Sequence, residues 1–198
     1  MAKRGDVLEL AVLGILHEGP MHGYELRTRL KAVLGAFRAF SYGSLYPTLR
    51  RMRERGWIVE GEPDPDATAP ALTGRRGKVV YRLTAEGKER LAELLAEAGP
   101  AAYDDEGFGV HFAFFAQTDA DVRLRILEGR RRRVEERRDG LRAALARTRA
   151  KLDRYTLQLQ EHGLDAVERE VRWLNELIDT ERQEQAAAPP QKQKKENP

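Results

Sequence analysis

Along the first part of the chain, apolar positions recur at the spacing that short packed helices require. Residues 6–17 are apolar on nearly every side, which predicts a helix that packs in several directions. Residues 22–34 show apolar side chains every three to four positions, with basic side chains elsewhere on the circumference. A third helix is expected from Ser44, a residue that can cap a helix, to Arg55, with Pro47 in its first turn.

The pattern then changes from helical to strand-like. Residues 57–59 and 78–83 are short and rich in β-branched and aromatic side chains, and the loop between them is polar. Thr84 can cap a fourth helix that extends to about residue 97, before Gly and Pro at 99–100 break it. The order helix, helix, helix, strand, strand is that of a winged helix-turn-helix domain.

The second half of the chain is predicted to consist of long helices. One runs from Asp119 to about residue 160, and a second, after the turn expected at residues 162–163, can fold back on it. The fold class is therefore mainly α: an N-terminal winged helix-turn-helix with three helices, a two-stranded wing and a linking helix, then long antiparallel helices. The expected domains are a winged helix-turn-helix at 1–98, a linker with an aromatic cluster at 99–118, a helical dimerisation domain at 119–183 and a disordered tail at 184–198.

Apolar residues on these long helices predict a dimer seam. They repeat every seven positions, with a second set four residues behind, as in a coiled coil. We expect them to bury a two-fold interface as well as the hairpin within one chain. The residues assigned to dimerisation are Leu141, Leu145, Leu152, Val171, Leu174 and Ile178.

Charge locates the candidate contact surface in the first half. The chain has 35 Lys and Arg against 32 Asp and Glu, a net charge of +3. Residues 1–98 hold 16 basic and 13 acidic side chains, whereas residues 99–198 hold 19 of each. Within the first half, residues 22–56 hold eight basic and two acidic side chains, a surplus able to attract a polyanion.

Other classes of protein find little support in the composition. The absence of Cys excludes disulfides, thiol nucleophiles and Cys-based zinc sites. With four scattered His and no phosphate-cradling glycine loop, we expect no enzyme, no cofactor and no metal. Residues 7–16 are too short to span a bilayer and no cleavage site follows them, so a cytoplasmic protein without a membrane partner is expected.

The third helix carries the residue types that read DNA. Its N-terminus with Ser44 suits phosphate, Tyr46 can donate to phosphate or lie against a sugar, and Arg50 or Arg51 can reach base edges in a major groove. The alternative is an ordinary amphipathic surface helix with solvated arginines. The loop between the two expected strands adds a second basic feature, because Arg75, Arg76 and Lys78 lie at its tip beside two glycines, as in a DNA-binding wing.

Three segments together carry a family resemblance. They are LELAVLGILHEGPMHGYEL at 8–26, GSLYPTLRRMRERGWI at 43–58 and YRLTAEGK at 81–88. Residues 7–98 resemble the PadR family of bacterial transcriptional regulators, and the helices after residue 108 resemble the C-terminal arm of its longer members. The resemblance implies a homodimeric regulator, usually a repressor that a small ligand releases from DNA. A departure from the family pattern is the lengthened loop of the wing.

The family's DNA contacts can be carried over onto matching positions of this sequence. They fall at the start of the second helix, on the third helix and in the wing. The residues are His22, Tyr24, Ser44, Tyr46, Pro47, Arg50, Arg75, Arg76 and Lys78.

Two features are candidates for an effector site. Phe108, His111, Phe112 and Phe115 are either core residues or one wall of a pocket, and Trp173 raises the same question. The basic run that contains Arg130 and Arg131 is either a solvated face paired with nearby acids or a site for a phosphorylated effector.

The expected function is therefore sequence-specific DNA binding by a homodimeric transcriptional regulator. The dependence of this binding on salt concentration tests it. Because a two-fold dimer presents two reading helices, the operator should be an inverted repeat in double-stranded DNA. The alternative is a winged-helix protein-interaction or assembly module without specific DNA binding, whose contacts would be far less sensitive to ionic strength.

Overall fold

The computed structural model describes residues 4–34, 42–61 and 79–187 and divides into two compact units. The first unit extends to Ile126 and the second begins at Leu127. The expected boundary after residue 98 therefore lies well before the observed division.

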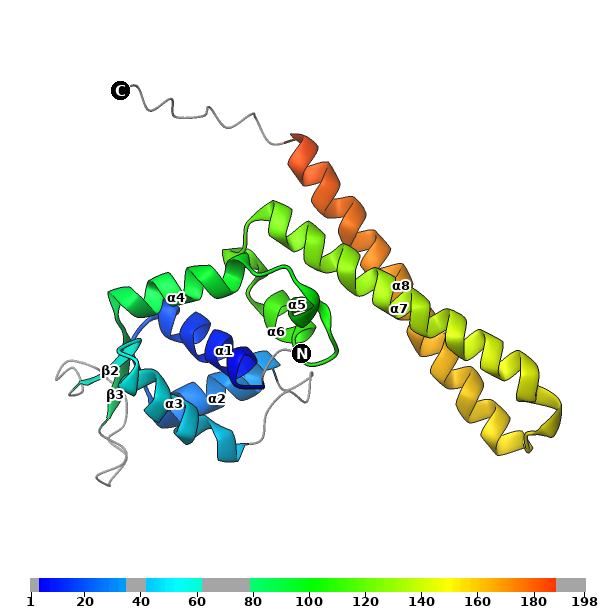
Figure 1. Cartoon of the computed structure of the whole chain (residues 1–198), viewed down its shortest axis with the longest axis horizontal. Helices are drawn as coiled ribbons and strands as arrows, with labels where there is room; N and C mark the ends of the chain where they lie inside the picture. Colours follow the sequence, from blue (N-terminus) through cyan, green and yellow to red (C-terminus); the bar gives the residue numbers. More distant parts are fainter. Residues whose placement is uncertain (1–3, 35–41, 62–78, 188–198) are drawn as a thin grey trace. The chain divides into compact units, whose positions relative to one another are not determined.

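Three helices open the first unit, as the sequence pattern predicts. They are α1 (Arg4–Glu18), α2 (Gly23–Leu34) and α3 (Leu45–Glu54), the last preceded by a 3-10 turn, η2 (Tyr42–Ser44). Figure 1 shows α1 in the middle of this unit, with α4 (Ala85–Ala96) on one side of it and α2 and α3 on the other.

The core of the first unit is built around α1. This helix contacts α2, α3, α4 and α6, as well as strand β3. Its apolar side chains are buried on all sides because no face is left for water, which explains why they show no amphipathic period. The buried apolar residues of α1 are Val7, Leu8, Leu10, Ala11, Val12, Leu13, Ile15 and Leu16.

A small antiparallel sheet covers one end of this core. Strand β3 (Val80–Leu83) lies between β1 (Met21–His22) and β2 (Ile58–Gly61). Ile58 pairs with Leu83, and Met21 pairs with Tyr81. The two strands of the wing were predicted, whereas β1 was not, because two residues are too few to produce a periodic signal.

Local end signals of the helices were mostly predicted correctly. Gly56 ends α3 with a φ of 74°, a conformation that suits glycine. The hydroxyl of Thr84 accepts a hydrogen bond from the Gly87 N–H at 3.0 Å and so caps α4.

The predicted cap of α3 was wrong. Ser44 precedes the helix with φ −90° and ψ −16°, which is a helical conformation, and its side chain makes no cap hydrogen bond. The reason is that the chain enters α3 from the 3-10 turn η2, so the extended backbone that a capping serine requires is not present.

Residues 99–118, expected to be a linker, are largely helical. They form α5 (Pro100–Tyr103), α6 (Phe108–Ala113) and a 3-10 turn, η4 (Phe115–Gln117). Phe114 is buried against α1, where a Cβ on Gly14 would lie 2.4 Å from its ring. The segment is thus part of the first unit's core. The sequence pattern did not predict this, because its Gly and Pro residues are typical of a linker.

The second unit is a hairpin of two long helices, but its turn is not where the sequence pattern placed it. Helix α7 (Ala120–Thr148) ends in η5 (Arg149–Lys151), and α8 (Arg154–Ala187) follows. The carboxylate of Asp153 accepts hydrogen bonds from the Tyr155 and Thr156 N–H groups at 2.8 and 3.1 Å. This N-terminal cap starts α8 at Arg154, before the turn predicted at 162–163, and Gly163 lies within the helix.

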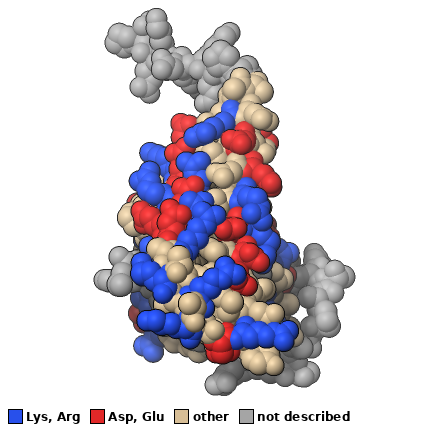
Figure 2. All heavy atoms as spheres, turned by 90° about the vertical axis from the view of Figure 1, so that its right-hand side faces the viewer, with Lys and Arg blue, Asp and Glu red and all other residues tan. Residues whose placement is uncertain are grey.

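Apolar packing and ion pairs join the two helices of the hairpin. Val171, Leu174 and Ile178 are buried, and the Arg130 guanidinium pairs with Glu170 at 2.7 Å. Further pairs between the helices join Arg142 to Glu168 and Arg182 to Glu128. Figure 2 shows basic and acidic side chains interspersed over one face of the molecule. This agrees with the balanced charge of the second half.

No helix in the described ranges is both long enough and apolar enough to cross a membrane.

The close approach of α4 to the α3–β2 turn gives a first prediction. A Cβ on Gly87 would lie 2.0 Å from the Trp57 carbonyl oxygen, so Gly87→Ala should lower the free energy of unfolding by about 1–3 kcal/mol. Gly99→Ala is the matched control in the same unit, because a Cβ there meets nothing within 4 Å. Denaturant unfolding of both variants tests this, and equal stability of Gly87→Ala and wild type would refute it.

Candidate nucleic-acid interface

The start of α2, helix α3 and strand β3 meet at one place. A Cβ on Gly23 would lie 3.3 Å from the Tyr81 ring and 4.0 Å from the Tyr46 ring. Gly23 thus allows the N-terminus of α2 to approach the Tyr81 ring of β3 closely, with the Tyr46 ring of α3 at ordinary contact distance. The predicted contacts His22 and Tyr24 are the chain neighbours of Gly23.

Three of the predicted contact residues are strongly exposed here. Tyr24 and Tyr46 have 64% and 58% of their surface exposed, which is unusual for large aromatic residues, and the Arg50 side chain is 75% exposed. Arg50 pairs with Glu54 one turn later at 2.9 Å. Such a surface ion pair contributes little stability, so Arg50 can exchange Glu54 for another anion at small cost.

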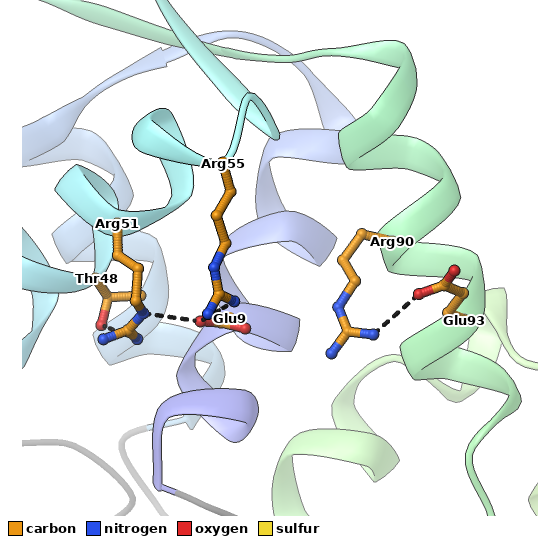
Figure 3. Close-up of polar contacts among 6 residues, drawn as sticks. All are labelled: Glu9, Thr48, Arg51, Arg55, Arg90 and Glu93. Carbon is orange, nitrogen blue, oxygen red and sulfur yellow. Dashed lines mark hydrogen bonds and ion pairs between the residues drawn. The ribbon is translucent and has the colours of Figure 1, made fainter.

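Arg51 is not part of this exposed group. Its Nε donates to the Oε1 of Glu9 on α1 at 3.1 Å, and its Nη2 donates to the Thr48 hydroxyl at 3.3 Å (Figure 3). Glu9 has only 2% of its side chain exposed. The structure therefore directs Arg51 toward the core, although the sequence pattern placed it with the base-reading side chains.

The sequence analysis did not identify Glu9 as important. Its signal is a single acidic residue within the otherwise apolar stretch 7–16. Such a residue must either face solvent or find a cationic partner, and the pattern alone does not distinguish the two.

Three further groups belong to the described part of this surface. Arg53 pairs with Glu60 of β2 at 2.6 Å. Burial raises the pKa of the Tyr81 phenol, and the nearby Glu60 and Tyr46 raise it further, so Tyr81 stays a neutral hydrogen-bond donor. Pro47 is exposed in the first turn of α3. The wing residues Arg75, Arg76 and Lys78 lie outside the described residues.

The aromatic residues proposed for an effector form one cluster in the first unit. The rings of Phe108 and Phe112 are 5.7 Å apart, and those of Phe112 and Phe115 are 4.9 Å apart. His111 is buried beside them, and its Nδ1 has no hydrogen-bond partner among the described residues. Burial lowers the pKa of His111 to about 4, although Asp104 acts in the opposite direction. His111 is therefore neutral at physiological pH.

The other effector candidates lie in the second unit. Arg130 is buried in its ion pair with Glu170, and Arg131 donates to the Asn175 side chain at 3.3 Å. Trp173 on α8 has 37% of its surface exposed. Both arginines thus have partners on α8 within the hairpin. The solvated-face alternative does not describe Arg130, because this arginine is buried.

A recess in the first unit is lined by other residues. It has a volume of about 290 Å³, an apolar floor that includes Leu91 and Leu95, and His17, Lys88 and Asp119 among its polar lining. None of the predicted effector residues lines it. Among the described residues, no group of three or more acidic or histidine side chains could hold a metal ion.

The topology of the first unit, with a wing after three helices and an exposed aromatic and cationic face on the third helix, defines a winged helix-turn-helix protein. Residues 12–93 match the model of the transcriptional regulator PadR-like family. The resemblance identified from the sequence motifs is thereby confirmed for residues 12–93.

Two curated relatives match part of the chain. The chain is 30% identical over 95 residues to the negative transcriptional regulator PadR of Bacillus subtilis, with 48% of each chain covered. It is 31% identical over 115 residues to a probable transcriptional regulator of Mycobacterium tuberculosis, with 58% of this chain and 56% of the relative covered. The chain therefore matches about half the length of these relatives.

Solved structures are also similar. One is Bacillus subtilis PadR in complex with operator DNA, at 20% identity and a TM-score of 0.40, covering 88% of this chain and 99% of that one. Another is smu.1604c from Streptococcus mutans, at 24% identity and a TM-score of 0.40, covering 90% and 98%.

The buried His111 gives a prediction for pH dependence. Below its usual pKa of 6.5 the unfolded chain binds a proton that the folded chain does not bind until about pH 4. The free energy of unfolding should therefore fall as pH falls across this window, by up to about 3 kcal/mol. In His111→Leu this contribution is absent, so the difference in stability between wild type and variant should change between pH 6.5 and 4. Denaturant unfolding at several pH values measures it, and parallel curves would contradict the assignment.

Proposed function

We propose that the protein is a sequence-specific DNA-binding transcriptional regulator. The observation that carries this proposal is the exposed face of α3, which presents Tyr46 and Arg50, together with the exposed Tyr24 at the start of α2. An aromatic phenol supplies a phosphate contact and an arginine supplies base-edge contacts, which is the division of labour expected of a helix in the major groove. The PadR-like match over residues 12–93 supports the same function.

We also propose that regulation is repression relieved by a small molecule. The relative described as a negative transcriptional regulator supports repression. For the effector site we retain the aromatic cluster of Phe108, Phe112 and Phe115 with His111. A phosphorylated effector at Arg130 and Arg131 is less favoured, because a phosphate would have to displace Glu170 and Asn175 from these arginines.

The protein is proposed to act as a homodimer on an inverted repeat. Of the residues assigned to the dimer seam, Val171, Leu174 and Ile178 are buried within a single chain and stabilise the hairpin. Leu141, Leu145 and Leu152 are only half-buried, so they can contribute to both the hairpin and a second copy. Tyr155 and Leu159, four residues apart on α8, have 78% and 67% of their surface exposed. Such exposure of neighbouring large apolar residues supports a contact with a second copy.

The first test of the function measures DNA binding directly. Genomic fragments recovered with the purified protein supply the operator, and Tyr46→Ala or Arg50→Ala should lower affinity for it by roughly 10- to 100-fold while the fold is retained. Wild-type binding should weaken steeply with salt, because each phosphate contact releases counterions.

Arg147→Ala is a matched control, because Arg147 is an exposed arginine on α7, outside the winged helix. Its affinity should equal that of wild type. If Tyr46→Ala and Arg50→Ala both bound the operator as wild type does, α3 would not be the reading helix. Binding partners captured without salt sensitivity would favour the protein-interaction alternative.

The second test concerns assembly. Leu159→Glu places a charge on the exposed apolar face of α8, so it should convert the dimer to a monomer at micromolar concentration and lower operator affinity. Gln158→Glu, on the neighbouring exposed position, introduces the same charge and should leave the dimer intact. Sedimentation velocity measures both, and a dimeric Leu159→Glu variant would exclude this face from the interface.

A further inference from the structure

Glu9 occupies an unusual place in the first unit. It is a carboxylate on the central helix α1 with 2% of its side chain exposed. Its Oε1 is 3.1 Å from Arg51 Nε and 3.6 Å from Arg55 Nη1, and both arginines come from the C-terminal half of α3 or the residue after it (Figure 3). Glu9 thus joins the helix at the centre of the core to the helix with the exposed aromatic and basic face.

Arg55 extends the same contacts to the middle of α4 through the Trp57 ring. Its guanidinium lies over the Trp57 ring at 4.8 Å, and that of Arg90 on α4 lies 5.4 Å from the same ring. Arg90 also pairs with Glu93 at 2.9 Å (Figure 3). The turn that follows α3 therefore contacts α1 through Arg55 and α4 through Trp57.

The energetic roles of the two partners are unequal. A buried carboxylate is costly unless cations neutralise it, so Glu9 requires Arg51 and Arg55. The arginines themselves are 40% and 50% exposed and would be hydrated without Glu9. Replacing Glu9 with glutamine therefore removes the charge attraction to both arginines without leaving a buried charge unpaired. The amide oxygen keeps one hydrogen-bond acceptor, so the attachment is weakened, not abolished.

The spacing of the two arginines determines what the attachment controls. Arg51 and Arg55 are one helical turn apart and lie on one side of the helix. Two contacts to a single carboxylate on this side resist rotation of α3 about its axis. Recognition tolerates only small errors in orientation, roughly 10–20°.

We propose that Glu9 is a positioning residue for DNA recognition, which fixes the orientation of α3 through Arg51 and Arg55. Arg51 serves this attachment and does not contact DNA. The proposal rests on the proposed function, in which α3 reads the operator.

The main experiment separates specific from non-specific binding in the full chain. Glu9→Gln should lower operator affinity about tenfold, because the reading side chains lose their orientation, while affinity for an unrelated duplex stays the same or rises. Glu18→Gln is the matched control, since Glu18 also lies on α1 and pairs with an arginine of another helix, Arg29, but at the surface. Its two affinities should equal those of wild type.

A double-mutant cycle tests the role of Arg51. If Arg51 acts through Glu9, then Arg51→Gln and Glu9→Gln combined should lose little more operator affinity than either alone, and Arg51→Gln should leave the salt dependence unchanged. If Arg51 contacts phosphate, the losses should add and the salt slope should fall by about one. Additive losses would overturn the proposal.

A measurement without DNA tests the attachment itself. The chain has two tryptophans, so in a Trp173→Phe background the fluorescence reports Trp57 alone. Glu9→Gln should shift the Trp57 emission and its quenching by iodide, because Arg55 loses its anchor beside the ring, whereas Glu18→Gln should not. Should Glu9→Gln fail to fold, Glu9→Asp keeps the charge but draws the carboxylate back from Arg55 without altering any group that touches the ring, and it should shift the Trp57 emission and quenching in the same direction.

These readouts have separate consequences. Unchanged Trp57 fluorescence together with unchanged operator affinity in Glu9→Gln would overturn the positioning role. Absence of salt-sensitive DNA binding in the wild-type chain would instead overturn the proposed function, and the fluorescence would still report whether Glu9 anchors Arg55.

Discussion

The burial of residues 7–16 of α1 is the constraint on which the rest of the first unit depends. Because this part of the helix has no face toward water, every neighbouring element must cover part of it, and α2, α3, α4, α6 and β3 each contact α1. The packing is close enough that Phe114 occupies the space where residue 14 would have a side chain. The orientation of α3, and with it the exposed face, follows from how α3 lies on this one helix.

The second unit is stabilised differently. A hairpin of two helices buries only one stripe of each, here including Leu127, Val134 and Leu174, and the remaining surface is charged. Its ion pairs are mostly exposed and each contributes little to stability. The apolar residues Tyr155 and Leu159 stay exposed on the single chain. Under the proposed dimer, a second copy covers them.

Local signals in the sequence predicted local structure well. Gly56 and Thr84 end or begin helices through their own backbone and hydroxyl, so the sequence was sufficient there. Ser44 and the hairpin turn were misjudged because each depends on context: a 3-10 turn precedes Ser44, and the cap at Asp153 outweighs the glycine at 163. The direction of Arg51 could not be predicted, because it depends on a carboxylate 42 residues away.

The arginines around α3 divide according to the acid that each one meets. Arg50 and Arg53 pair with the exposed acids Glu54 and Glu60, and water screens both pairs. Arg51 and Arg55 pair with the carboxylate of Glu9, which is only 2% exposed and therefore not hydrated. A phosphate chain can therefore take over the first two at little cost, whereas removing the second two would leave a buried charge unpaired. Under the proposed function, one short basic segment serves both folding and recognition. An arginine whose partner acid is buried stabilises the fold, and an arginine whose partner acid is exposed is available to DNA.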